Sequence, residues 1–117
     1  MGEAGRYSYE GLERVIHEKA RLSILTALAA NPEGLLFPDL KELCSLTDGN
    51  LARHLQALKD AGLIEVWKKA RATLCCLSEP GRKQFESYLA ELERVVQDAA
   101  AKRRTRKRPD RKGWSTA

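Results

Sequence analysis

The sequence has few of the residues from which metal and catalytic sites are usually built. It holds only two histidines and three cysteines. It has no Gly-rich phosphate loop, no helical His-x-x-x-His pair and no nucleophile elbow. Cys75 and Cys76 are adjacent and cannot easily pair with each other, and an odd number of cysteines argues against a disulfide framework. We therefore expect no enzyme activity, no metal ion and no cofactor.

Long apolar runs are also lacking. No run approaches the ~20 residues of a membrane span, and the first ten residues have no apolar segment typical of a signal peptide. At 117 residues, 43% of them hydrophobic, the chain fits one domain with a modest core. A cytoplasmic protein without membrane contact is expected.

Charge is distributed unevenly along the chain. Residues 1–101 carry 13 Lys/Arg against 15 Asp/Glu, a net charge of −2, whereas residues 102–117 carry 8 against 1, a net charge of +7. Self-repulsion predicts a disordered tail over 102–117. This tail could add phosphate affinity, bind RNA or another acidic partner, or only improve solubility. We expect a flexible start over 1–8 and a folded domain over 9–101.

The rest of the chain is organised around residues 37–63, which read as two short helices separated by a turn. The second helix has an apolar seam at spacings of four and three, made of Leu51, Leu55 and Leu58. Either Thr47 or Asp48 can cap its start, and Gly62 suits its end. The first helix has an apolar face made of Leu40, Leu43 and Leu46.

Further elements flank this pair. A helical region is expected from Tyr9 to about Ala30, either as one helix or as two with a break near residues 17–21. After the pair, β-prone runs at 63–67 and 73–77 predict a hairpin. Ser78 is a good N-cap for a last helix.

The stretch Asp48-Gly49-Asn50-Leu51-Ala52-Arg53-His54-Leu55, followed by Leu58, Gly62 and Leu63, resembles the recognition helix of winged helix-turn-helix transcriptional regulators of the MarR/ArsR-like superfamily. The resemblance extends from about residue 12 to about residue 96. It implies a mainly α fold with a small β-hairpin wing (α+β), flanked by N- and C-terminal dimerisation helices. It also implies a break in the N-terminal helical region and a small strand at residues 35–37.

DNA contact is the function that this resemblance implies. Arg53 and Asn50 lie three residues apart on one helix face, and Arg pairs with guanine while Asn pairs with adenine. Thr47 and Asp48 would fix the start of the helix, and His54 would either pack at the core or contact a phosphate. Without the fold, Asn50 and Arg53 would be read as merely solvated.

The hairpin tip carries three cations, Lys68, Lys69 and Arg71. Contact with DNA phosphates or the minor groove is the functional interpretation. Since hairpin tips are usually polar, solvation alone is the alternative.

Two apolar stripes suggest a homodimer, because the domain's own core is small. We expect dimerisation through the first and last helices, at Leu12, Val15, Ile16, Phe85, Tyr88, Leu89, Leu92, Val95 and Val96. The alternative is that the last stripe folds back on its own domain. A small-molecule effector, which the sequence does not identify, would bind between these same two helices.

The cysteines raise the question of a sensor. Glu42-Leu43-Cys44 is similar to part of the metal-binding sequence of ArsR-type repressors, but position 46 is Leu where a second cysteine is usual. We interpret all three thiols as small buried hydrophobes, with thiol redox sensing as the alternative. The sequence thus predicts a homodimeric, sequence-specific DNA-binding repressor, and its rival is a winged-helix protein-interaction module.

Overall fold

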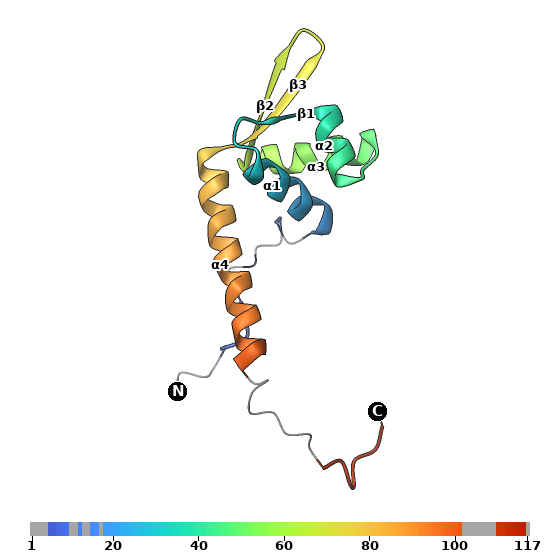
Figure 1. The fold of residues 1–117 in the computed structure, drawn as a ribbon, viewed down its shortest axis with the longest axis vertical. Coiled ribbons are helices and arrows are strands. Elements are labelled where there is room, and N and C mark those ends of the chain that lie inside the picture. Colours follow the sequence, from blue (N-terminus) through green and yellow to red (C-terminus); the bar gives the residue numbers. More distant parts are fainter. Residues whose placement is uncertain (1–4, 10–11, 13–14, 17, 102–109, 117) are drawn as a thin grey trace.

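The computed structural model describes residues 5–9, 12, 15–16, 18–101 and 110–116. Its elements run α1 (Lys19–Ala30), β1 (Leu35–Leu36), α2 (Phe37–Cys44), α3 (Asp48–Asp60), β2 (Ile64–Lys69), β3 (Ala72–Leu77) and α4 (Glu79–Ala101). Figure 1 shows α1, α2 and α3 gathered at the base of a hairpin that projects away from them, while α4 extends in the opposite direction. The predicted α+β architecture is confirmed. None of the described helices combines the length and apolar character needed to span a bilayer.

The core lies where α1, α3 and the sheet meet. The predicted seam of α3 is fully buried or nearly so, and Leu40 of α2 is buried with it. The expectation for Leu43 was wrong, because its side chain is 63% exposed. Since α2 has only eight residues, it packs on the domain through Leu40 and leaves Leu43 exposed to solvent.

The N-terminal region differs from the expected helix. Helix begins at Lys19, and none of the described residues before it is helical. Arg6 forms an ion pair of 2.7 Å with Asp98 near the end of α4, and the Tyr9 hydroxyl donates to the same carboxylate at 2.9 Å. Arg94 lies over the Tyr9 ring at 5.0 Å. The described part of the start that we expected to be flexible is therefore attached to α4.

The sheet is antiparallel with the order β1-β3-β2. The predicted hairpin and the implied short strand at residues 35–36 are confirmed, whereas Phe37 already belongs to α2. Only Ala70 and Arg71 connect β2 and β3, so the link between the strands is shorter than the gap between the β-prone runs at 63–67 and 73–77. Register places Leu36 opposite Leu74 and Leu74 opposite Trp67. These three side chains form a row on one face of the sheet.

The junction between the hairpin and α4 is tightly bonded. The Ser78 hydroxyl donates to the carbonyl of Gly62 at 2.6 Å and accepts from the Gly81 amide at 2.9 Å, as its predicted capping role requires. The Ser78 amide donates to the carbonyl of Leu63 at 3.1 Å. Gly62 has a φ of +77° and stops α3 as predicted. The end of α3 is therefore bonded directly to the start of α4.

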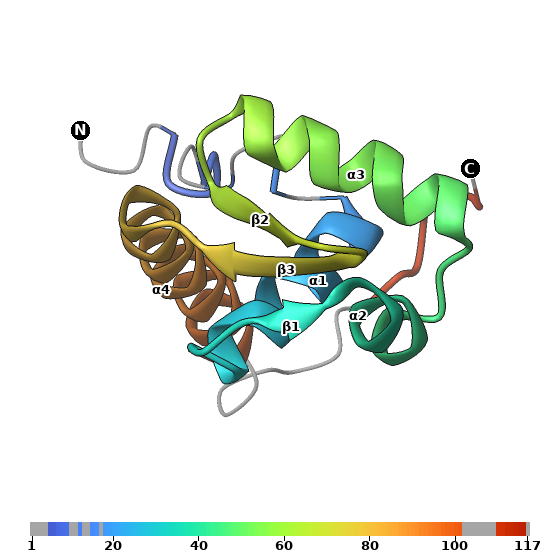
Figure 2. The same ribbon diagram turned by 90° about the horizontal axis from the view of Figure 1, so that it is seen from above.

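This junction also sets where the helices lie around the sheet. Figure 2 shows α3 alongside the β2 side of the sheet, with α4 leaving from the end opposite α2. A Cβ at Gly81 would lie 1.9 Å from the Leu63 carbonyl oxygen. The first turn of α4 can pack this closely only because residue 81 has no side chain.

We predict that Gly81→Ala is strongly destabilising, because its methyl group would collide with backbone atoms of Leu63 rather than with a flexible side chain. The free energy of unfolding in a urea titration should fall by about 3 kcal/mol, the upper part of the range for overpacking. Gly49→Ala is the matched control: nothing lies within 4 Å of its Cβ position, so it should be neutral or slightly stabilising. Equal stability of the two variants would contradict this account of the junction.

Candidate nucleic-acid interface

The start of α3 is fixed by Thr47. Its hydroxyl accepts from the Asn50 amide at 3.2 Å, which identifies Thr47 as the N-cap. Asp48 is instead the first helical residue and receives an ion pair of 2.9 Å from Lys41 of α2. Ser45 adopts a left-handed conformation with a φ of +54° between the two helices. Thr47 thus caps the helix, while Asp48 ties its first turn to α2.

The outward face of α3 is a polar ridge, which we define as Gly49, Arg53, Gln56 and Asp60. All four are exposed and recur at helical spacing. Asn50 is exposed on one flank of the ridge, so Asn50 and Arg53 both lie on the surface of α3. Gln56 was not predicted as a contact residue, although its spacing of three residues from Arg53 places it on the same face. The Gln56 amide donates to Asp60 at 2.8 Å.

His54 lies on the inner side of α3, where only 4% of it is exposed. Its Nδ1 accepts from Nε of Arg21 in α1 at 3.3 Å, and its Nε2 lies 3.4 Å from an Arg53 guanidinium nitrogen. Burial, followed by the charge of Arg53, lowers the pKa of His54, although Glu18 opposes this shift. A direct DNA contact is not supported by this position, and packing at the core is the alternative that fits.

A groove of about 340 Å³ separates α3 from the wing. Its walls include Ala52 and Gln56 from α3 and Thr73 from the wing. Lys59 of α3 and Lys68 of β2 also line it, so both sides of the groove carry a cation. Lys68 was predicted as a contact residue and Lys59 was not. Lys59 lies eleven residues after Asp48, and only the folded hairpin brings the two lysines to one groove.

The wing tip exposes the three cations predicted for it. Lys68 and Lys69 lie in β2, Arg71 lies in the turn, and all three are exposed. Within the described part of the chain, no ion pair involves any of these three side chains. Their charge is therefore open to a partner such as a phosphate.

All three cysteines are free thiols. Cys75 is buried in β3, and burial raises its pKa to about 11. Cys76 and Cys44 are only partly buried, so the expectation that all three thiols are buried was wrong for these two. Cys76 is less buried than Cys75 because neighbouring residues of a strand face opposite sides of the sheet. Burial also raises the pKa of Cys44 and, together with Glu65, that of Cys76. Neutral thiols react poorly with oxidants, which favours a packing role.

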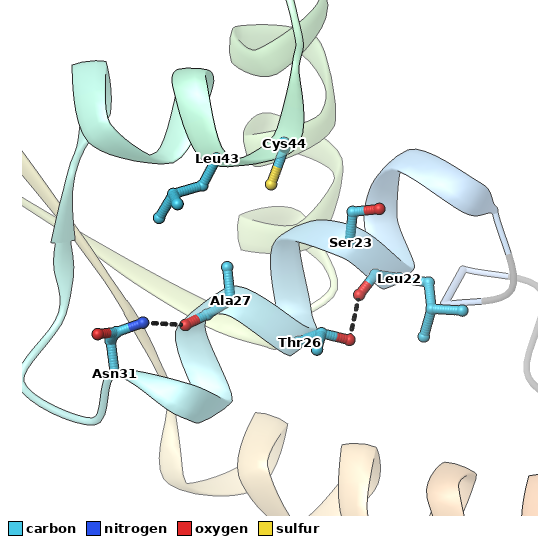
Figure 3. Close-up of a pocket in the computed structure, with 7 residues that line it drawn as sticks. All are labelled: Leu22, Ser23, Thr26, Ala27, Asn31, Leu43 and Cys44. Atoms are coloured by element: carbon cyan, nitrogen blue, oxygen red, sulfur yellow. Dashed lines mark hydrogen bonds between the residues drawn. The ribbon is translucent and has the colours of Figure 1, made fainter.

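A recess of about 410 Å³ lies between α1 and α2 (Figure 3), whereas we expected an effector pocket between the first and last helices. Figure 3 shows the polar groups of Thr26 and Asn31 bonded to carbonyls of α1 itself, at 2.7 and 2.8 Å. The Ser23 hydroxyl likewise donates to the Lys19 carbonyl at 3.0 Å. The polar lining is therefore largely satisfied, and the recess offers mostly apolar contact and the thiol of Cys44.

The residues expected at a dimer surface divide into three groups. Ile16, Phe85 and Tyr88 are at most 3% exposed and belong to the core of the single chain, so their assignment to a dimer surface was wrong. The first turns of α4 close this core. Leu12, Val15 and Leu92 are partly buried against the core, and Val95 is partly buried as well. Leu89 and Val96 are 45% and 65% exposed and remain available to a partner.

Comparison with known proteins places this geometry in a family. The model of the winged helix DNA-binding domain matches residues 20–96. An uncharacterised protein of Methanocaldococcus jannaschii is 36% identical over 83 residues, which cover 68% of this chain and 89% of that protein.

Solved structures agree with this match. A transcriptional regulator homologue from Pyrococcus horikoshii has a TM-score of 0.71 at 22% identity, covering 85% of this chain and 98% of that one. The MepR–DNA complex of Staphylococcus aureus has a TM-score of 0.68 at 20% identity, covering 89% and 87%. The matched family model spans all the elements that build the ridge, the groove and the wing. The chain therefore belongs to the winged helix DNA-binding domain family.

Proposed function

We propose that the protein is a homodimeric repressor that reads a specific duplex sequence with α3 in the major groove. The observation that carries this proposal is the polar ridge of α3. It presents Arg53 and Gln56, with Asn50 on its flank, from a helix whose opposite side is buried. Arg makes two hydrogen bonds to guanine, and Asn or Gln makes two to adenine. Occupancy of a promoter by such a dimer would block polymerase, and this makes repression the expected sign.

The cations beside the ridge would hold the DNA backbone. Lys59 and Lys68 lie on the two sides of the groove, and Lys69 and Arg71 are exposed on the wing. Because residues 1–101 have a net charge of −2, local clustering of cations must supply this attraction. The basic residues of 102–117 would add affinity that does not depend on sequence. The similar fold of MepR in its DNA complex supports this arrangement.

A second copy would pack on the distal half of α4. The helix has 23 residues and is about 35 Å long, yet its buried residues all lie at or before Tyr88. Leu89 and Val96 are exposed beyond that point. Pairing of two such helices would relate two copies of α3 by a two-fold axis, and half-sites would then be spaced about 34–36 Å apart.

A small-molecule effector belongs to the proposal as a ligand of the recess between α1 and α2. Cys44 lines this recess and is the last residue of α2. Ser45, in its left-handed conformation, follows immediately and leads to the cap of α3. If a ligand moved the end of α2, this short, bonded turn would therefore transmit the movement to the recognition helix.

A protein-interaction module is the second candidate, and the outer face of the wing favours it. The row of Leu36, Leu74 and Trp67 lines a mostly apolar recess of about 550 Å³. Trp67 is 60% exposed and Leu36 is 42% exposed. Exposed aromatic and aliphatic side chains in one patch are typical of protein contacts.

We predict that the full chain enriches one duplex motif from a randomised library. Against the selected duplex, Arg53→Ala and Gln56→Ala should each weaken binding by about 1–3 kcal/mol, because each removes one base contact. Each should also relax the preference at one base position, measured by fluorescence anisotropy with single-base variants of the duplex.

Lys69→Ala serves as the contrasting variant in the same titration. It should weaken binding to all duplexes alike and reduce the salt slope by about one, as the loss of a phosphate contact requires. If the full chain enriches no motif, the folded domain does not read DNA, and the protein-interaction candidate is preferred.

We also predict a dimer in solution. Light scattering should give twice the monomer mass of 13.1 kDa. The double variant Leu89→Glu/Val96→Glu should return it to the monomer, because each copy would bury two negative charges in the pairing surface. Leu43→Glu is the control, since Leu43 is about as exposed as Val96 but lies on α2. A monomeric wild type, or dissociation by the control alone, would contradict the role of α4.

A further inference from the structure

The imidazole of His54 lies between two guanidinium groups from different helices. Nε of Arg21 in α1 is 3.3 Å from Nδ1, and Nη2 of Arg53 in α3 is 3.4 Å from Nε2. The ring is buried, whereas Arg53 is exposed on the ridge. One buried side chain thus contacts both a residue of the supporting helix and a residue of the recognition surface.

A neutral imidazole can accept only one hydrogen bond. One ring nitrogen carries the hydrogen and donates, and the other accepts. Both arginines are donors without acceptor capacity. The burial and the neighbouring charge of Arg53 that lower the pKa of His54 keep the ring neutral near pH 7. Arg21 and Arg53 therefore cannot both donate to His54 at the same time.

In each neutral tautomer of His54, one of the two arginines donates to the ring nitrogen that carries no hydrogen. With hydrogen on Nε2, Nδ1 accepts from Arg21 and nothing holds Arg53 on the ring. With hydrogen on Nδ1, Nε2 accepts from Arg53, while the Nδ1 side faces Glu18 at 3.9 Å. In that state Arg21 keeps its ion pair with Glu18 at 3.6 Å and its bond to the Val15 carbonyl at 3.5 Å.

We propose that His54 is a positioning residue for Arg53: it holds the Arg53 guanidinium against α3 in one tautomer and releases it in the other. On release the ring loses the Nδ1 proton to water and gains one at Nε2, so its charge stays at zero. Arg21 then becomes the donor to Nδ1, and no buried acceptor is left without a partner. The consequence for base reading rests on the proposed function.

This arrangement explains why a buried histidine lies next to a base-reading candidate. An arginine free in solvent samples many rotamers and loses that freedom when it binds a base. Holding Arg53 on His54 restricts its rotamers before DNA arrives. When Arg53 is released, Arg21 replaces it as the donor to the His54 ring. This avoids the desolvation cost of a buried acceptor that has no hydrogen-bond partner.

The test reads the tautomer directly and needs no DNA. The full chain is labelled with [15N]histidine, and long-range ¹H–¹⁵N correlations at pH 7.5 report which ring nitrogen is protonated. The chain has two histidines, and His54→Gln assigns the signals. Arg53→Ala should shift His54 toward the Nε2–H tautomer, whereas Arg21→Ala should shift it toward Nδ1–H. Lys83→Ala removes an exposed cation from α4 and should change neither signal.

Opposite shifts in the two arginine variants support the proposal. Absence of a shift in both variants, or a shift in the same direction, would overturn it. Should Arg21→Ala not fold, Arg53→Ala still decides the matter, because Arg53 is exposed and its loss leaves the core intact. An unchanged tautomer in Arg53→Ala would then show that His54 does not hold Arg53.

A second measurement separates this inference from the proposed function. On the selected duplex, Arg21→Ala should bind about tenfold more weakly, which corresponds to part of the free energy of one base contact. Its affinity for a random duplex should stay unchanged. Opposite tautomer shifts in a chain that prefers no duplex would support the hold on Arg53 and overturn DNA reading. A chain that prefers one duplex but shows no tautomer shift in the arginine variants would support DNA reading and overturn the hold on Arg53.

Discussion

The fold depends most on the crossing of two backbone turns, at Gly62–Leu63 and at Ser78–Gly81. One hydroxyl, that of Ser78, serves both turns by donating to the end of α3 and accepting from the start of α4. The lack of a side chain at Gly81 lets the two turns touch. Because β2 and β3 lie between these turns, the crossing closes the hairpin at its base. The recognition helix, the wing and α4 thus share a single anchor point.

The surface that this anchor supports is locally basic on a chain whose folded part is nearly neutral. The exposed lysines at the groove and wing come from α3 and β2, which meet at the Gly62 turn. Of the acidic groups on α3, Asp48 pairs with Lys41, and Asp60, at the end of the ridge, accepts from Gln56. Affinity for a polyanion therefore depends on where cations lie rather than on their total number.

Much of this fold could be predicted from local patterns, because those patterns are enforced by local physics. The leucine seam of α3, the Thr47 and Ser78 caps and the Gly62 stop each depend on neighbours within four residues or on a single backbone angle. Local patterns could not decide between alternatives that depend on contacts distant in sequence. Core packing, one of the two alternatives given for His54, is the one that fits its burial beside Arg21, thirty-three residues away.

The misplaced residues show the same limit. Phe85 and Tyr88 share the spacing of Leu89 and Val96, yet the Gly81 contact draws only the first turns of α4 into the core. Periodicity gives the face of a helix but not how far along the helix that face is covered. Lys59 was missed for the converse reason, since only the folded wing brings Lys68 opposite to it.

The division of α4 has a consequence for how such a chain can change. Up to Tyr88 the helix is bound to the fold by a cap, a backbone contact and two buried rings. Beyond Tyr88, exposed positions such as Leu89 and Val96 can mutate without cost to the core. One continuous helix thus joins a base that the core fixes to a distal segment in which the exposed positions are not fixed by the core. New pairings between copies could arise there while the recognition surface keeps its shape.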